Sequence, residues 1–289
     1  MPDQKTSFDK ARDMSLSEQL TYSTVQLLCL DGKGGQSTGT AFIIDICMNE
    51  EKQTCVRILV TNKHVIANKK SIIFELCLAD DEGKPIDTKT FQAITSDFLW
   101  RAHPDPNVDL CCLPLAPILQ NAEKQGLKPF FVSLSLEFIP SEESLKKLTA
   151  LEEVIMVGYP IGLSDTYNHK PIIRKGITAT HPKNDYRGKK ETLLDIAAFP
   201  GSSGSPVFIL NLGAYAQGNG INLGTRFLFM GVMTWIHLFD AKGELRIAEL
   251  PNMPIPHTGI PTNLGIMIKS ERVKEFEKLF PRPAEENKA

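Results

Sequence analysis

The sequence predicts an all-β protein that closes with one helix. Short β-like apolar runs separated by turns recur from Tyr22 to Trp235. Strands of this length and spacing are typical of a barrel or a sandwich. Before its C-terminal end the chain offers only short helical candidates. Its 289 residues suffice for one large domain or two modest ones.

The first half contains the chain's first group of strand candidates, which are 24–30, 39–46, 56–61, 71–79 and 88–95. The charged loop 80–85 fits a hairpin between the last two. His64 follows the third strand, where a turn leads into a single helical turn. It therefore lies at the boundary of two elements.

The second half repeats this pattern, with strand candidates at 154–157, 172–178, 192–198, 207–210 and 227–235. Between the halves, residues 116–150 mix Pro, Gly, Ser and charges around a short helical candidate, Ser141–Leu151. At the end, Ser270 can cap a helix over 271–279, which Pro281 stops. The residues that share one face of this helix, and predict that it packs on the strands, are Val273, Phe276 and Phe280.

Composition excludes several classes of function. The net charge of −2, with both signs mixed, gives no field for nucleic acid. The apolar runs are too short to cross a bilayer and the polar start lacks a signal-peptide core, so we expect no membrane association and a cytoplasmic location. The six cysteines lack C-x-x-C spacing and several lie in strand-like runs, so we expect buried thiols, no metal and no cofactor.

The stretch 199–206, Phe-Pro-Gly-Ser-Ser-Gly-Ser-Pro, carries the strongest chemical signal. Gly201 permits a tight turn without a Cβ penalty, so the N–H groups of Gly201 and Ser203 can converge as an oxyanion hole. Each such donor contributes roughly 3 to 4 kcal/mol to acyl transfer. We predict that Ser203 is a nucleophile. For this stretch alone, a plain turn between two strands is the alternative.

His64 and Asp109 supply the two roles that a serine nucleophile needs. His64 would accept the proton of Ser203 and pass it to the leaving group, and Asp109 would orient the imidazole. Asp109 precedes an apolar run, so we expect it to be partly buried and to need a partner. A strand-end acid that faces water is the alternative at this position. Asp195 is a competing candidate for the acid. The chain order His, Asp, Ser differs from that of α/β-hydrolases and subtilisins.

Other polar residues receive an ordinary interpretation. The remaining histidines lie in loop-like contexts and are expected to be surface or turn residues: His103, His169, His181, His237 and His257. Ser202 and Ser205 flank the predicted nucleophile, but only Ser203 has the G-x-S-G spacing.

Six motifs in this order resemble the chymotrypsin-like (trypsin-fold) serine peptidases, most closely the bacterial branch with the HtrA/Deg protease domains. They are Val-Thr-Asn-Lys-His64-Val-Ile, Asp109-Leu-Cys-Cys-Leu, Gly158-Tyr-Pro-Ile-Gly-Leu, Lys175-Gly-Ile, the serine motif from Asp195 to Pro206, and Gly231-Val-Met-Thr-Trp235. The resemblance runs from about Thr24 to Phe280. It implies two six-stranded antiparallel β-barrels of the chymotrypsin type with a C-terminal helix, and a serine endopeptidase that uses the triad His64, Asp109 and Ser203 through an acyl-enzyme.

This resemblance implies a domain organisation. We expect an N-terminal arm (1–20), a first β-barrel (21–120, with His64 and Asp109), a linker (121–150), a second β-barrel (151–268, with Ser203), and a C-terminal helix and tail (269–289).

Positions transferred from the family also predict specificity. Ala197, six residues before Ser203, stands at the pocket floor and supplies no anion for Lys or Arg. Thr234, Trp235 and Ile236 stand on the strand that pairs with substrate backbone, and the bulk of Ile236 should narrow the pocket entrance. We therefore expect a small or medium apolar P1 residue.

The sequence departs from the family at three points. Ser202 replaces the Asp that pairs with a freed N-terminus in the digestive enzymes, so we do not expect activation by N-terminal cleavage. Val65 replaces a cysteine beside the catalytic histidine, in keeping with a reduced compartment. Because no sequence follows Ala289, we expect neither a PDZ domain of the HtrA kind nor the regulation and oligomerisation that go with it.

Two alternatives to an always-active peptidase stay open. One is a protease-fold module that binds a peptide by β-addition without cutting it, although an intact triad argues against this. The other is an enzyme that needs an activating protein partner, with the loops 137–150, 211–226 and 240–263 ordering the oxyanion turn only when that partner binds.

Overall fold

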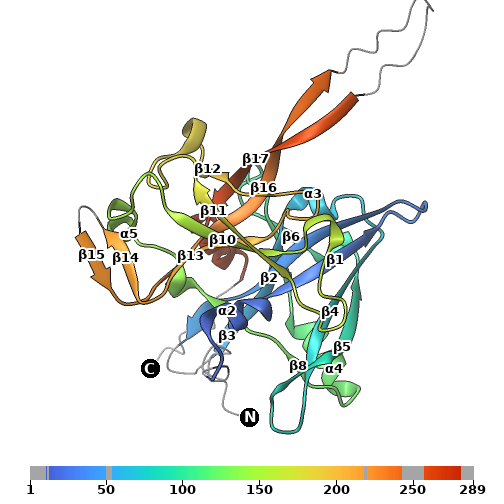
Figure 1. Ribbon diagram of the computed structural model, residues 1–289. Helices are drawn as coiled ribbons and strands as arrows, with labels where there is room; N and C mark the ends of the chain where they lie inside the picture. Colours follow the sequence, from blue (N-terminus) through green and yellow to red (C-terminus); the bar gives the residue numbers. More distant parts are fainter. Residues whose placement is uncertain (1–10, 12, 50–53, 218–219, 243–256, 281–289) are drawn as a thin grey trace, which may run out of the picture.

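The computed structural model describes residues 11, 13–49, 54–217, 220–242 and 257–280. The first part of the chain (blue to green) and the later part (yellow to red) each build one β body, and the two bodies pack together (Figure 1). Short helices lie around them. The prediction of an all-β protein is confirmed.

The first body is a nine-stranded sheet whose main path runs β5-β4-β1-β2-β3-β7-β6. Its strands along this path are β1 (Thr24–Leu30), β2 (Gln36–Asn49), β3 (Thr54–Thr61), β4 (Ser71–Ala79), β5 (Pro85–Thr95), β6 (Arg101–Ala102) and β7 (Cys111–Pro114). Two more strands come from the predicted linker. β8 (Pro129–Phe130) pairs with β4, and β9 (Leu134–Ser135) runs parallel to β2. Two-residue strands are too short to show an apolar period, so the sequence did not predict them.

The second body is a closed six-stranded barrel in the order β10-β11-β12-β17-β16-β13. Its strands are β10 (Glu153–Gly158), β11 (Ile172–Thr178), β12 (Glu191–Asp195), β13 (Pro206–Asn211), β16 (Arg226–Lys242) and β17 (His257–Lys269). A separate hairpin of β14 (Ala214–Gln217) and β15 (Gly220–Leu223) lies beside it.

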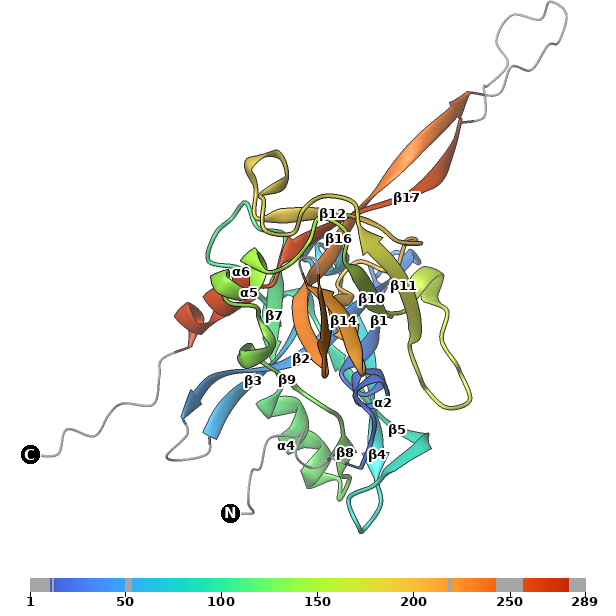
Figure 2. The same ribbon diagram turned by 60° about the vertical axis from the view of Figure 1, so that its left-hand side comes forward.

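β16 and β17 continue beyond the barrel as a two-stranded ribbon. Their pairing runs from Gly231↔Lys269 to Lys242↔His257, with bulges between Met233 and Trp235 and between Ile236 and Leu238. Figure 2 shows this ribbon projecting from the body. The strand that carries Thr234 and Trp235 is therefore shared between the barrel and the ribbon.

Helices are short throughout the described residues. The α-helices are α2 (Leu16–Thr21), α3 (Lys63–Ile66), α4 (Ala116–Lys124), α5 (Glu142–Lys146) and α6 (Glu271–Lys274). The 3₁₀ turns are η1 (Asp97–Leu99), η2 (Leu136–Phe138), η3 (Pro160–Gly162), η4 (Tyr186–Gly188) and η5 (Glu275–Leu279). None of the described helices is long and apolar enough to cross a membrane.

The helical predictions need two corrections. The helix α4 was not predicted, because the sequence around it was interpreted as linker. Ser270 does not cap the last helix: it has helical backbone angles, its side chain accepts no capping bond, and its N–H donates to the Met230 carbonyl. The predicted span 271–279 is helical, but its second half, η5, is the tighter 3₁₀ form.

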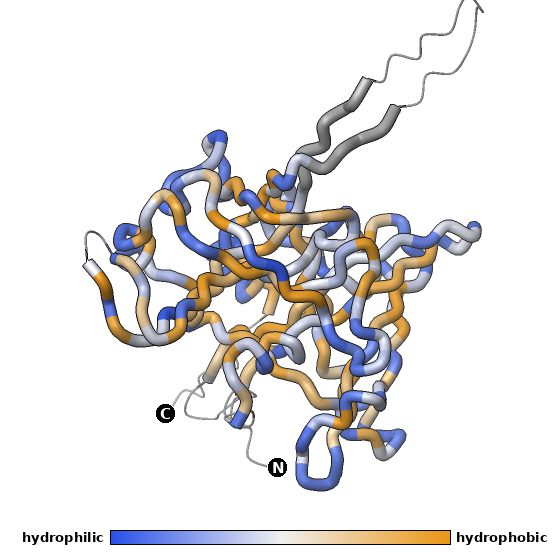
Figure 3. Tube along the Cα trace, in the orientation of Figure 1, coloured by the Kyte–Doolittle hydropathy of each residue, from blue (hydrophilic) through white to orange (hydrophobic). Residues whose placement is uncertain are grey.

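The largest buried cluster joins both bodies and the last helix. It contains Phe42 and Ile58 from the first body, Phe208 and Phe229 from the second, and Phe276 from η5. Phe42 and Phe229 meet edge to face with ring centroids 5.3 Å apart. Burying each such side chain contributes about 1.5–3 kcal/mol, so this cluster fixes the two bodies against each other. Figure 3 shows the apolar residues (orange) concentrated along the strands and the hydrophilic ones (blue) in the outer loops.

Candidate active site

The helical turn α3 holds His64 directly after β3. Val65 packs so closely on β2 that a Cβ at Gly39 would lie 2.4 Å from the Val65 Cγ1 atom. Asn62, which precedes the turn, is buried, and its Nδ2 donates to the Asp109 carbonyl at 2.8 Å. The end of β3, the helical turn α3 and the loop that carries Asp109 are thereby fixed together.

His64 and Asp109 form a bidentate contact. The ring Nδ1 of His64 lies 2.6 Å from Asp109 Oδ2, and the backbone N–H of His64 donates to Asp109 Oδ1 at 3.1 Å. With Nδ1 bound to the carboxylate, Nε2 is the ring nitrogen left for a substrate or a nucleophile. The alternative of a water-facing Asp109 is wrong, because the carboxylate is partly buried and paired.

The pKa of Asp109 is lowered from its ordinary value of 3.8. Partial burial opposes ionisation, but the hydrogen bonds and charge of His64 and a hydrogen bond from Thr234 together outweigh it. Asp109 is therefore an anion at neutral pH, as a group that stabilises an imidazolium must be.

Thr234 connects the acid to the serine. Its Oγ1 donates to Asp109 Oδ2 at 2.9 Å, and its carbonyl accepts a 3.0 Å hydrogen bond from Ser203 Oγ. The structure thus links Ser203 to Asp109 through Thr234, and Asp109 to His64, with the serine hydroxyl turned to the Thr234 carbonyl. The sequence predicts Thr234 only as a substrate-binding residue. The signal in the sequence for a further partner is a hydroxyl residue inside the apolar run 231–235, because such a residue needs a hydrogen-bond partner if it is buried.

The serine turn, residues 199–204, presents two backbone donors. The Pro200 carbonyl accepts from Ile161 N–H at 2.5 Å, and the Ser202 carbonyl accepts from Ser205 N–H at 3.0 Å. Because C=O and N–H of a trans peptide point in opposite directions, the N–H groups of Gly201 and Ser203 face away from those partners. Neither donates a hydrogen bond to another residue of the described chain.

Gly201 is required by the backbone of this turn. Its φ is +92°, in the region that favours glycine, and an added Cβ would lie 2.6 Å from the Tyr159 carbonyl oxygen. Ser202 closes the same turn from inside. It is fully buried, its N–H donates to the Phe199 carbonyl at 2.9 Å, and its Oγ accepts from Phe199 N–H at 3.2 Å.

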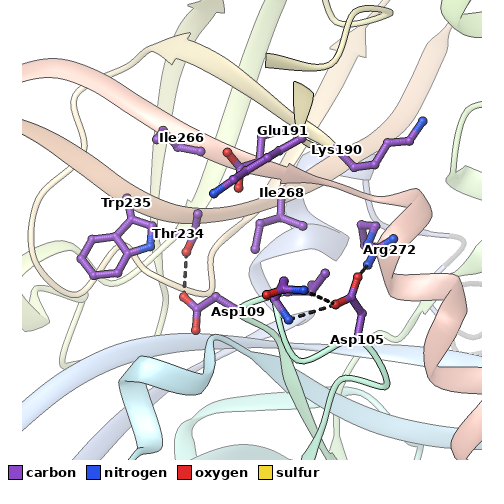
Figure 4. Close-up of a pocket in the computed structure, with 12 residues that line it drawn as sticks. Asp105, Asp109, Lys190, Glu191, Thr234, Trp235, Ile266, Ile268 and Arg272 are labelled. Carbon is purple, nitrogen blue, oxygen red and sulfur yellow. Dashed lines mark hydrogen bonds and ion pairs between the residues drawn. The ribbon is translucent and has the colours of Figure 1, made fainter. Parts of the chain in front are cut away.

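A cavity of about 380 Å³ opens beside Asp109. Trp235 and Thr234 border it on one side, Ile266 and Ile268 of β17 line it, and the ion pair of Asp105 with Arg272 lies at its far end (Figure 4). Its wall mixes these apolar side chains with charged ones, Asp109, Lys190 and Glu191.

The other residues singled out from the sequence lie as follows. Ala197 is half-buried on the segment between β12 and the serine turn, and the side chain of Ile236 lies outside the described residues. Asp195 is exposed at the end of β12. Ser205 is fully buried, and no described residue hydrogen-bonds its Oγ.

The ordinary interpretation of the histidines is wrong in one case. His103 is buried, and its ring bonds the Arg272 carbonyl at 2.9 Å and accepts from Asp105 N–H. It fixes the loop before Asp109 to the last helix. His169 pairs with Glu75 at 3.3 Å. The side chains of His237 and His257 lie outside the described residues.

The cysteines that the sequence predicts as buried thiols lie mostly inside the first body. Cys29, Cys47, Cys111 and Cys112 are buried, and Cys55 and Cys77 are half-buried. Among the described side chains, no group of three His, Cys, Asp or Glu residues could hold a metal.

Two packed antiparallel β bodies with a predicted triad between them define a chymotrypsin-like fold. A family model for the trypsin-like peptidase domain matches residues 39–213, more than half of the chain. The chain therefore belongs to the trypsin-like peptidase family, and the predicted family is confirmed. Membership places it among the hydrolases that act on proteins or peptides.

The chain is similar to solved protease structures. The serine endoprotease from Yersinia pestis is 16% identical with a TM-score of 0.45, covering 96% of this chain and 67% of its own. The active form of the Rv3671c protease from M. tuberculosis is 15% identical with a TM-score of 0.48, covering 98% and 96%. No curated protein matches the chain.

Proposed function

We propose that the protein is a serine endopeptidase in which Ser203 is the nucleophile, His64 the general base and Asp109 the orienting acid. One observation supports this most: Asp109 binds His64 and Thr234 through the same carboxylate, and Thr234 in turn binds Ser203. A structural acid would need no such link to a serine in a glycine-bounded turn.

The proposed reaction starts with a rotation of Ser203 about χ1, from the Thr234 carbonyl toward His64. Oγ then attacks the scissile carbonyl carbon while His64 Nε2 takes the hydroxyl proton. The oxyanion would be stabilised by the N–H groups of Gly201 and Ser203. His64 returns the proton to the leaving amine, and water then releases the acyl group from Ser203 by the same steps.

For specificity we propose a small or medium apolar P1 residue, because Ala197 brings no charge to the pocket floor. Thr234 and Trp235 would pair with the substrate backbone, and Ile236 would restrict the entrance. A library of peptides that varies P1 tests this. A clear preference for Arg at P1 would contradict the proposal.

A second candidate is the same enzyme held in a resting state until a protein partner binds. Two observations favour it: Ser203 Oγ is engaged by Thr234, and the Trp235 indole lies against the His64 ring. The serine turn itself is already hydrogen-bonded. The partner would therefore act on the contacts of Thr234 and Trp235 and not on that turn. We also propose a cytoplasmic location, on the basis of the buried thiols, and cell fractionation tests it.

The first experiment is reaction of the purified protein with a fluorophosphonate probe, read by intact mass. We expect one adduct, which is lost in Ser203→Ala and in His64→Ala. Ser205→Ala is the matched control, because the Ser205 hydroxyl has no described partner and lies in the same stretch. No adduct on folded wild type, with or without a candidate partner, would favour a binding module and overturn the proposal.

A further inference from the structure

A buried threonine of the first body holds the serine turn of the second. Thr40 lies in β2 and is fully buried. Its Oγ1 donates to the Gly201 carbonyl at 2.9 Å, and its N–H donates to the Ser203 carbonyl at 2.9 Å. One residue thus binds the carbonyls of both predicted oxyanion residues.

The same hydroxyl also accepts a hydrogen bond. The Tyr159 N–H donates to Thr40 Oγ1 at 3.0 Å. Tyr159 begins the segment that carries Ile161, whose N–H holds the Pro200 carbonyl. Because the Gly201 N–H belongs to the peptide of that carbonyl, its direction depends on this segment. Thr40 Oγ1 therefore connects the two parts that orient the predicted donor.

Close packing leaves this contact little freedom. A Cβ at Gly204 would lie 1.9 Å from the Thr40 carbonyl oxygen, and that oxygen accepts a 2.6 Å hydrogen bond from Thr61 Oγ1. The turn and β2 therefore approach as nearly as two backbones can. A rotation of the turn would therefore break the hydrogen bonds that Thr40 makes to it.

We propose that Thr40 is a positioning residue. Its hydroxyl fixes the segment that directs the Gly201 N–H, and its own N–H holds the Ser203 carbonyl, so that the turn keeps the geometry that stabilises the oxyanion. This rests on the proposed endopeptidase function. Thr40 does not contact substrate in this proposal. Loss of the Thr40 hydroxyl should weaken stabilisation of the transition state and leave ground-state binding of a peptide unchanged. Only the oxyanion depends on the direction of the N–H donors in the turn.

The test compares Thr40→Val, which removes the hydroxyl, with Thr40→Ser, which keeps it. For Thr40→Val we expect kcat to fall at least tenfold with KM within twofold, and the affinity of a peptide aldehyde, whose hemiacetal oxygen occupies the hole, to fall by the same factor. Thr40→Ser should stay within threefold of wild type. The matched control is Thr24→Val, a buried threonine of the neighbouring strand whose hydroxyl has no described partner.

Several outcomes would overturn the proposal. They are an unchanged kcat in folded Thr40→Val, an equal loss in Thr40→Ser, or a loss confined to KM. Thr40→Ala serves if the Val variant does not fold. Failure of both to fold, with Thr40→Ser folded, would assign the hydroxyl to folding and not to positioning. Turnover by the wild type, and its loss in Ser203→Ala, is measured first. Failure of the proposed function would then show in the wild type, and failure of the Thr40 proposal would show only in the Thr40 variants.

Discussion

The imidazole of His64 and the indole of Trp235 are stacked, with ring centroids 5.0 Å apart and planes inclined by 28°. Trp235 is 58% exposed, which is unusual for a side chain of this size. Its indole therefore covers one face of the ring that we propose as general base. If substrate pairs with β16 as proposed, it contacts this indole on its way to Ser203.

The stack predicts how accessible Trp235 is to a solution quencher. In a Trp100→Phe background, Trp235 is the only tryptophan left of the two in the chain. We expect His64→Ala to raise acrylamide quenching of its fluorescence, because the imidazole no longer shields one face. His181→Ala in the same background is the control. Equal quenching with and without the His64 ring would mean that the two rings do not stack in solution.

Thr234 predicts a loss of activity that depends on its hydroxyl. Thr234→Val removes the donor to Asp109, and a hydrogen bond to a charged group contributes about 1.5–3 kcal/mol. We expect kcat/KM on a peptide substrate to fall roughly 10- to 100-fold. Thr234→Ser keeps the donor and should retain most of the activity. If both variants behave alike, the hydroxyl does not support Asp109.

Gly204 predicts a large effect on stability. Its φ of +87° resembles the +82° of Gly213, so alanine at either position carries a similar backbone strain of about 1–2 kcal/mol. Gly213→Ala meets no atom within 4 Å, but Gly204→Ala would collide with the Thr40 carbonyl. We expect denaturant unfolding to show a loss of about 1 kcal/mol for Gly213→Ala and about 3–5 kcal/mol for Gly204→Ala. Similar losses would show that the turn can move away from β2.

The buried thiols predict a loss of stability at alkaline pH. Burial raises the pKa of Cys29 and of Cys55 to about 11 and that of Cys112 to about 12, from an ordinary value of 9.0. Their contribution is complete below pH 9 and disappears as the pH rises through the raised values, because only the unfolded chain ionises easily. Between pH 9 and its raised pKa, each such thiol is ionised in the unfolded chain and protonated in the folded one. Over that range it lowers the free energy of unfolding by about 1.4 kcal/mol per pH unit.

Urea unfolding under reducing conditions at pH 7, 9 and 10.5 measures this slope. Cys112→Ala is less stable at pH 7 because it leaves a small cavity, but its stability should decline less steeply above pH 9. Parallel declines in the variant and the wild type would show that Cys112 does not contribute.

The sequence allowed the predicted nucleophile, base and acid to be chosen because each lies in a motif with its own spacing. His64 and Asp109 do meet in the structure, although 45 positions separate them. The strand pattern likewise predicted five of the six strands of the second body, and the family resemblance implied that they close into a barrel, but β17 was not predicted. Two-residue strands such as β8 show no apolar period and were missed.

The supporting contacts could not be predicted in the same way. Thr40 and Thr234 act through side-chain hydrogen bonds to residues more than 100 positions away, and nothing local in a strand identifies such a partner. His103 lies in a Pro-rich loop that resembles a surface turn, yet the last helix covers it. Ser270 has the residue type of a cap, but its N–H is used by the neighbouring strand.

The uncharged closure of the turn by Ser202 and Phe199 has a consequence for how the protein is made and controlled. Nothing in this bond depends on a newly exposed chain end. A carrier protein or an affinity tag joined to the N-terminus should therefore leave turnover unchanged. In a cell, no precursor would have to be cut to form this turn. Control of the proposed enzyme would then act on synthesis, on degradation, or on access to the proposed active site, where a protein partner would act.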